Sequence, residues 1–137
     1  MRCRNLLPAA MLAILLPWGA RAAVSPENFQ LRNAGDLAAL CASDPADPSA
    51  VAAIHFCHGF AEGAYAVLKI EQDANPRLRL FCMPPAPPSR NAAIGGFVAW
   101  VKADPARAAL APADGLAGYL SQAYPCPPTA ATNTRRK

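Results

Sequence analysis

Apolar residues along this chain recur every three or four positions, which is the periodicity of helices packed on one face. The longest such series runs from Ala50 to Leu68 and contains no proline. Its members on one helical face are Ala50, Ile54, Cys57, Ala61, Ala64 or Tyr65, and Leu68. No segment alternates apolar and polar residues over the length of a strand. The pattern therefore predicts an all-α protein.

Capping residues and prolines mark where the first two helices begin and end. Asn33 is the expected N-cap of the first helix, and Asp36, three residues later, gives an acidic form of the capping box. The second helix is expected to begin near Asp47 or Ser49 and to end at about Ile70, before a proline-containing break. The buried face of the first helix is expected to carry Leu37, Leu40 and Cys41.

The C-terminal half predicts two more main helices with a short one between them. The third helix opens at Ser89 or Asn91 and ends at Asp104, with Trp100 near the edge of its buried face. Proline at the first helical position predicts a short helix over 105–110 and the start of the last helix at 112. The expected buried residues of the two long helices are Ile94, Phe97, Val98 and Val101, then Ala113, Leu116, Ala117, Leu120 and Tyr124. The fold class is a small bundle of four main helices plus one short helix.

Two glycines lie inside the second helix, Gly59 and Gly63. Each costs about 1 kcal/mol relative to alanine in a helix interior. Their spacing of four places them on the same side of the helix. We therefore expect another helix to approach closely at these two positions.

The N-terminal residues have the features of a secretory leader. Two arginines precede an apolar run over 6–19, and Ala20-Arg21-Ala22 has the small-x-small form that signal peptidase accepts. The run is shorter than the about 20 apolar residues of a membrane span and contains prolines. We expect cleavage after residue 22, a periplasmic domain over 23–128 with no membrane anchor, and a disordered basic tail over 129–137.

Most of the positive charge lies outside the expected domain. The sequence has 13 basic and 9 acidic residues, and three of the basic ones belong to the leader. Three more form the extreme C-terminus, Arg135, Arg136 and Lys137. Nucleic-acid binding requires basic residues gathered on one folded face. The charge distribution therefore gives no indication of a nucleic-acid partner.

Four cysteines remain after the leader, Cys41, Cys57, Cys82 and Cys126. An even number in a short exported chain is typical of a disulfide scaffold, although four cysteines allow three pairings and sequence alone cannot select one. Geometry favours Cys82–Cys126, because the outer ends of an antiparallel third and fourth helix coincide. It also favours Cys41–Cys57. Cys57 lies about 12 Å into the second helix, and the loop over 42–48 is long enough to fold back over that distance. The other pairings stay open.

The pair His55 and His58 is the cluster with most metal-binding character. The two side chains are one helical turn apart, so both could face one ion. Structural zinc takes four ligands, however, and a disulfide-bonded Cys57 supplies no thiolate. The carboxylates are scattered, and no nucleophile, phosphate or dinucleotide motif is present. We predict a protein without catalytic activity, metal site or cofactor.

The proline-rich segment from Pro84 to Pro88 predicts an extended connector with few conformations. A PxxP segment of this kind can bind an aromatic groove, or it can serve as a stiff loop between helices. The second interpretation is favoured, because partners with such grooves are rarely met in the periplasm.

Five motifs along the chain resemble the Rap/Tai family of small periplasmic immunity proteins, which protect bacteria from amidase effectors delivered by type VI secretion. They are Leu37-x-x-Leu40-Cys41, the segment from Phe56 to Gly63, Phe81-Cys82-Met83-Pro84, Asp104-Pro105, and Leu116-x-x-x-Leu120-x-x-x-Tyr124-Pro125-Cys126. The resemblance implies a disulfide-containing helical domain, often homodimeric, that binds a peptidoglycan amidase and blocks its substrate cleft. The proline-rich connector departs from the family pattern, and the motifs describe the scaffold and not a binding face.

Partner contacts are expected from exposed aromatic and arginine side chains, which dominate binding hot spots. The candidates are Tyr65, Trp100 and Arg90. The alternative functions are a periplasmic stress or holdase protein and a structural helical module. A holdase switched by acid needs many titratable groups, whereas only 16% of this chain is charged and it has two histidines.

Overall fold

The computed structural model describes residues 24–128, and this part of the chain contains helices and no strand. The helices in chain order are the 3-10 helix η1 (Pro26–Gln30), α1 (Ala34–Cys41), α2 (Ala50–Ala74), the 3-10 helix η2 (Pro76–Leu78), α3 (Arg90–Lys102), α4 (Pro105–Ala108) and α5 (Pro112–Ala123). The predicted all-α fold with four main helices and one short helix is confirmed. The predicted leader over 1–22 and tail over 129–137 lie outside the described residues.

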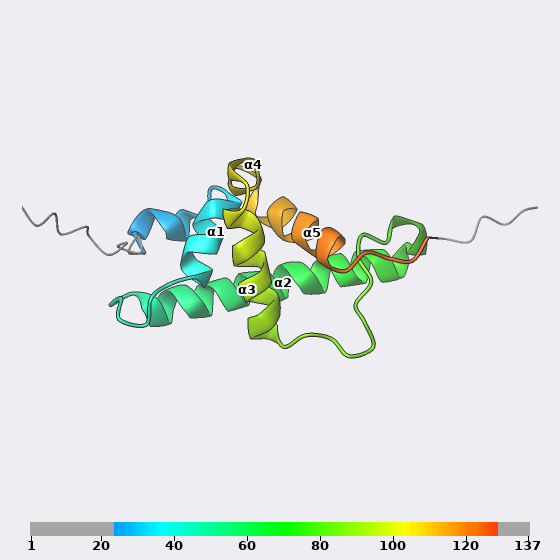
Figure 1. Ribbon diagram of the computed structural model, residues 1–137, viewed down its shortest axis with the longest axis horizontal. Helices are drawn as coiled ribbons and strands as arrows, with labels where there is room; N and C mark the ends of the chain where they lie inside the picture. Colours follow the sequence, from blue (N-terminus) through cyan, green and yellow to red (C-terminus); the bar gives the residue numbers. More distant parts are fainter. Residues whose placement is uncertain (1–23, 129–137) are drawn as a thin grey trace, which may run out of the picture.

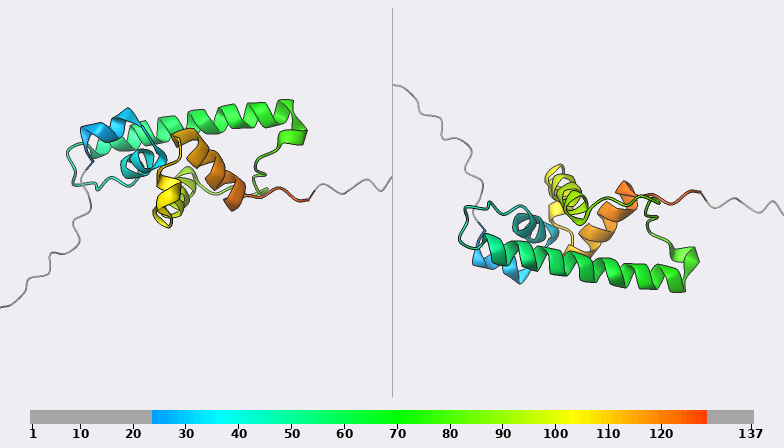
Figure 2. Two further views of the ribbon diagram at one scale, coloured as in Figure 1. Left: turned by 90° about the horizontal axis from the view of Figure 1, so that it is seen from above. Right: turned by 90° about the horizontal axis from the view of Figure 1, so that it is seen from below.

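The long helix α2 runs along the length of the domain, and α3 crosses it in the view of Figure 1. Figure 2 shows α1, α3 and α5 on one side of α2 when the molecule is viewed from above and from below. Within residues 24–128, no α-helix covers the opposite side of α2. Near the start of α2, η1 contacts it through Phe29, whose ring centroid lies 5.7 Å from that of Phe56.

The core lies between α1, α3 and α5, and one residue of the connector after α2 completes it. This residue is Phe81, which has no exposed surface and belongs to the same buried cluster as the apolar faces of the three helices. The buried members of this cluster are Ala34, Leu37, Ala38, Phe81, Phe97, Val101, Leu116, Tyr119 and Leu120. A smaller cluster joins α1, α2 and α3 through Leu40, Ala53, Cys57 and Ile94.

Two disulfides cross-link the domain, and their pairing is the one that helix geometry favours. Cys41 at the end of α1 is bonded to Cys57 in the first half of α2. Cys82 in the connector is bonded to Cys126 after α5, and its backbone N–H donates to the carbonyl of Tyr124 at 2.8 Å. Each bridge is expected to contribute about 2–4 kcal/mol. Two disulfides in so short a chain fit an exported protein.

The predicted helix starts agree with the observed caps. The side chain of Asn33 accepts from the N–H of Asp36 at 2.9 Å, and Ser89 accepts from Ala92 at 3.2 Å. The capping box at α1 is only half formed, because the Asp36 carboxylate accepts from the N–H of Arg32 and the side chain of Asn28 and not from Asn33.

Two details of the predicted helices are wrong. α2 ends at Ala74 and not at about Ile70, because no helix-breaking residue occurs before Asn75-Pro76. On α5, Ala113 is exposed, whereas Gly115 and Tyr119 are buried. The face of α5 that packs on α1 and α3 is thus rotated from the predicted one, because a glycine allows closer packing than the apolar pattern indicates.

The predicted close helix approach at Gly59 and Gly63 is also wrong within the described chain. Both glycines are exposed, and a Cβ added at either would have no atom within 4 Å. The close approaches occur at Gly115, where an added Cβ would lie 2.6 Å from the Cβ of Ala34, and at Gly96, where it would lie 2.1 Å from the Tyr119 hydroxyl. The tight contacts therefore join α5 to α1 and α3.

Candidate functional site

A pocket of about 300 Å³ lies between α2, α3, α5 and the proline-rich connector. We call it the α2–α3 pocket. α2 packs mainly on α1 and α5 and makes few contacts with α3. The pocket lies where α2 and α3 are not in close contact. The pocket is lined by Ala61, Glu62, Tyr65, Met83, Pro87, Pro88, Arg90, Ala93, Ile94, Phe97, Leu116, Tyr119 and Leu120.

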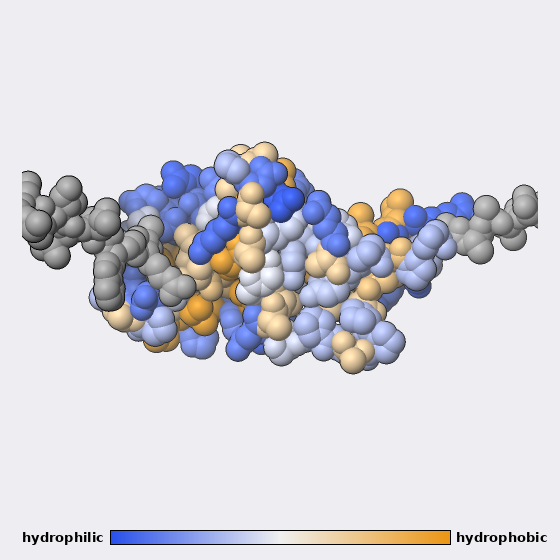
Figure 3. Space-filling model, viewed as in Figure 1, coloured by the Kyte–Doolittle hydropathy of each residue, from blue (hydrophilic) through white to orange (hydrophobic). Residues whose placement is uncertain are grey.

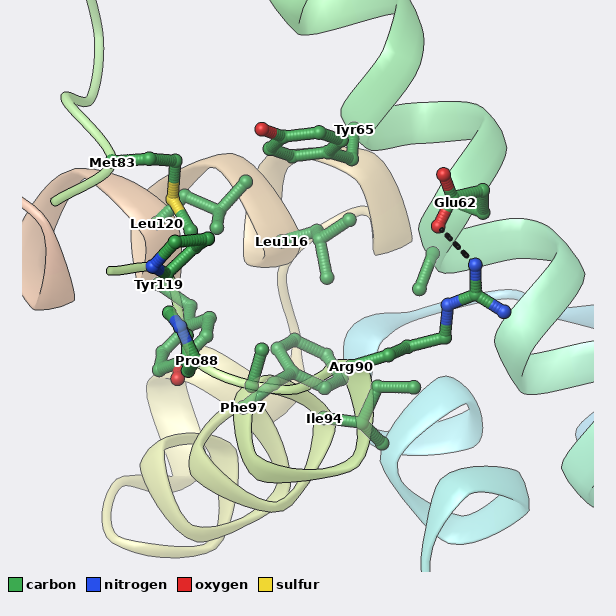
Figure 4. Close-up of a pocket in the computed structure, with 13 residues that line it drawn as sticks. Glu62, Tyr65, Met83, Pro88, Arg90, Ile94, Phe97, Leu116, Tyr119 and Leu120 are labelled. Atoms are coloured by element: carbon green, nitrogen blue, oxygen red, sulfur yellow. Dashed lines mark ion pairs between the residues drawn. The ribbon is translucent and has the colours of Figure 1, made fainter. Parts of the chain in front are cut away.

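Aromatic and aliphatic side chains form the walls of this pocket. Figure 4 shows Leu116 between Tyr65 on α2 and Phe97 on α3, with Met83 of the connector on the far side. The Tyr65 ring lies 5.6 Å from the ring of Phe81, which holds it against the core. Phe97 packs edge-to-face on Tyr119 at 6.0 Å. The wall is therefore built on residues that the core already fixes.

An ion pair crosses the mouth of the pocket. Nη2 of Arg90 on α3 lies 3.1 Å from Oε2 of Glu62 on α2, and both side chains are more than half exposed (58% and 56%) (Figure 4). Exposed pairs of this kind contribute about 0–1 kcal/mol, because solvent screens the attraction. This contact therefore leaves both side chains free to exchange partners at low cost.

The tyrosine at the back of the pocket stays neutral at physiological pH. Burial raises the pKa of the Tyr119 hydroxyl above its ordinary value, and a hydrogen bond with Tyr124 raises it further. Of the Asp, Glu, Lys and Arg residues, Glu62 and Arg90 line the pocket, and both stand at its mouth.

Two of the three predicted contact residues, Tyr65 and Arg90, line this pocket. Trp100 does not. Its indole N–H donates to the side chain of Gln122 at 2.8 Å, and the guanidinium of Arg107 lies 4.6 Å from its ring centroid. Sequence reasoning missed Glu62 as a site residue, because its role depends on Arg90, which lies far from it in the sequence.

The family model of the Rap1a immunity proteins matches residues 33–126. The chain belongs to the Rap1a immunity protein family. The matched range begins at the N-cap of α1 and ends at Cys126, so it contains both disulfides and every residue that lines the pocket. No curated protein and no solved structure gives a significant match. Family membership indicates an immunity protein, which acts by binding a protein effector and not by catalysis.

The candidate metal ligands of this family member lie on α2. His55 is exposed and His58 is half-buried. Within residues 24–128, no three His, Cys, Asp or Glu side chains gather closely enough to hold a metal ion. Cys57, between the two histidines, is committed to its disulfide.

The side of α2 away from the bundle carries a second apolar surface. We call it the α2 outer face and define it by Ala52, Phe56, Gly59, Gly63, Val67 and Ile70, all exposed and spaced by three or four residues. Val67 and Ile70 are 55% and 68% exposed.

On the face of the molecule drawn in Figure 3, apolar residues reach the surface in separate places among polar ones.

α2 also has the length and mean hydropathy of a membrane-crossing helix. Core helices of water-soluble proteins can have the same length and hydropathy. Its middle carries Glu62, which pairs with Arg90, and Lys69 pairs with Asp73 near its end. Charged side chains inside a bilayer are costly and rare.

Proposed function

We propose that this protein is an exported immunity protein that binds a peptidoglycan amidase effector of a type VI secretion system and inhibits it by covering its substrate cleft. The observation that supports this proposal most is the family match over residues 33–126. The two disulfides are consistent with a periplasmic location, where such bonds form and persist. The protein then works through its surface, without catalysis, cofactor or metal.

The proposed location requires that residues 1–22 are removed after export and that the domain over 23–128 is released without a membrane anchor. The charges on α2 support an aqueous setting for that helix. The tail over 129–137 contributes the positive charge of Arg135, Arg136 and Lys137.

We propose that the amidase contacts the surface around the α2–α3 pocket. Tyr65 and Arg90 meet there, and the connector places Pro87 and Pro88 beside them. Aromatic side chains and arginine supply a large share of binding energy at protein interfaces. Trp100 is engaged by Gln122 and Arg107, so we place it at the edge of the interface and not at its centre.

We further propose that the α2 outer face joins two copies of the chain. Its members are spaced like the core positions of a helix pair, and the small residues Gly59 and Gly63 at its centre permit close approach. Sedimentation analysis should find a dimer in the processed protein and a monomer in the Val67→Lys variant, with unchanged circular dichroism. A monomeric wild-type protein would contradict this part of the proposal.

Co-expression with an amidase effector, sought among the products of the neighbouring genes, tests the function. Periplasmic amidase alone should lyse the cells, the two proteins together should restore growth, and a stable complex should be recovered from the periplasm. A charge-reversed Arg90→Glu variant should rescue less well than Lys102→Glu, its matched control at the other end of α3. Lysis despite full production of this protein, with no complex, rejects the proposal. General suppression of client aggregation in that case would favour the holdase alternative.

A further inference from the structure

The α2–α3 pocket has a buried floor, so it differs from a flat contact surface. Phe97, Leu116, Leu120 and Ile94 form its floor, and each is 9% exposed or less. The charged groups that line it, Glu62 and Arg90, stand at the mouth. An apolar group that enters here meets mostly apolar side chains, and the exposed charges of Glu62 and Arg90 remain in contact with water.

The size of the pocket selects what can enter. Its volume is about 300 Å³, and an engineered apolar cavity of about 150 Å³ is enough to bind benzene. The space therefore admits one aromatic ring or one branched aliphatic side chain with room for its backbone attachment at the mouth. Met83 on one wall is flexible and polarisable, so the pocket can adapt to the exact shape of that group.

The arginine at the mouth can bind a second group. Glu62 contacts Nη2 of Arg90, and no other partner of this guanidinium is found within residues 24–128. A guanidinium has five N–H donors in a fixed fork and can hold a carboxylate through two of them. Because the present pair is weak, an incoming carboxylate can share Arg90 with Glu62 or replace it.

We propose that the α2–α3 pocket receives one large apolar side chain, aromatic or branched aliphatic, from the bound amidase, and that a carboxylate next to this side chain pairs with Arg90. The proposal rests on the proposed function, since the family match is what indicates a protein partner. It names the anchor of that interface. A buried anchor in a pocket surrounded by weaker contacts is the usual form of a binding hot spot.

The first test uses small probes in place of the amidase. N-acetyl-phenylalanyl-aspartyl amide is titrated into the disulfide-intact protein, and the methyl NMR signals of Met83 and Ile94 are followed. These signals should shift in the wild type and in Ala99→Leu, an exposed control position on α3. They should stay unchanged in Ala93→Leu, which fills the pocket. The matched phenylalanyl-lysyl amide should bind more weakly, because it offers no carboxylate to Arg90.

Three results of this titration would overturn the proposal. The first is no shift up to the solubility limit of the dipeptide. The second is the same shift in Ala93→Leu as in the wild type. The third is binding of toluene without binding of the dipeptide, which would make the pocket a site for free apolar molecules. Should Ala93→Leu fail to fold by circular dichroism, Ala61→Leu fills the pocket from the α2 side and takes its place.

The second test separates this inference from the proposed function. Calorimetric titration with the catalytically inactivated amidase should show affinity about tenfold lower or worse for Ala93→Leu, and unchanged affinity for Ala99→Leu. Equal affinity of all three proteins overturns the pocket as the anchor site and leaves the function standing. If the wild type does not bind the amidase, the function fails, and the inference about the amidase anchor fails with it.

Discussion

Two pairs of glycines in this domain lie in opposite surroundings. An added Cβ at Gly96 or Gly115 would collide with Tyr119 or Ala34, whereas at Gly59 or Gly63 it would meet nothing within 4 Å. The first pair allows α5 to pack closely on α3 and α1, and the second is exposed on α2. The molecule therefore consists of a tightly packed layer of α1, α3 and α5 and of the long helix α2, part of whose surface is not covered by other helices of residues 24–128. The binding surfaces that we propose, the α2 outer face and the α2–α3 pocket, both lie along this long helix.

The largest effect is expected where the connector enters the tight layer. Replacing Phe81 with alanine removes a side chain with no exposed surface and leaves a cavity, so the free energy of unfolding should fall by about 3–5 kcal/mol. Its neighbour Leu80 is 49% exposed, and Leu80→Ala should change stability by about 0.5 kcal/mol or less. Urea unfolding of both variants measures the contrast. Similar losses in the two would show that the connector is not anchored by Phe81.

A smaller effect is expected at the buried carboxylate of the tight layer. Burial opposes ionisation of Asp36, but hydrogen bonds from Asn28 and Arg32 outweigh it and hold the pKa of this carboxyl below 3.8. The stabilisation is therefore present above about pH 4 and is lost as pH falls through the lower pKa of the folded state. Asp36→Asn should cost about 1.5–3 kcal/mol at pH 7 and should lose less stability than the wild type on further acidification. Unfolding curves from pH 7 to pH 2 test this, and parallel pH profiles would contradict it.

Gly96 and Gly115 should each resist substitution by alanine. The added methyl group must displace the Tyr119 hydroxyl or the Ala34 side chain, so we expect a loss of about 1–3 kcal/mol for either variant. In Gly96→Ala, near-ultraviolet circular dichroism should also change, since the Tyr119 ring has to move. A neutral substitution at both positions would show that the contacts with α5 are loose.

The smallest effect has the opposite sign. At Gly59 and Gly63 an alanine fits without contact and has the higher helix propensity, so each substitution should raise stability by about 1 kcal/mol. Urea unfolding at dilute protein concentration, where any dimer is dissociated, isolates this helix effect. Destabilisation at both positions under those conditions would mean that α2 has a partner within its own chain after all.

The helices were predictable because their signals are local. Asn33 and Ser89 cap α1 and α3 as expected, and Asp104 caps α4, since an N-cap acts on residues two or three positions away. The disulfide pairing was favoured but not fixed by the sequence, because it depends on which helix ends meet. The two glycines that matter for packing were missed. Gly96 and Gly115 sit in short helices with no special spacing, and only the crossing of the helices brings Tyr119 and Ala34 against them.

The candidate site was predictable only in part, for the same reason. Tyr65 and Arg90 are 25 positions apart in the sequence, and their shared pocket depends on how α3 crosses α2. Residue type made them candidates, but it also selected Trp100, whose contacts with Gln122 and Arg107 lie elsewhere. Glu62 was not singled out, because a single carboxylate on a helix has no distinguishing pattern until its partner is placed.

Inhibition of the enzyme tests the account most directly. The amidase proposed as the partner, sought among the products of the neighbouring genes, is assayed on purified peptidoglycan with increasing amounts of the processed, disulfide-intact protein. We predict that hydrolysis falls to the background rate when the two proteins reach equal amounts. Hydrolysis that continues at the full rate with this protein in excess would contradict the central claim that its surface captures and silences an effector.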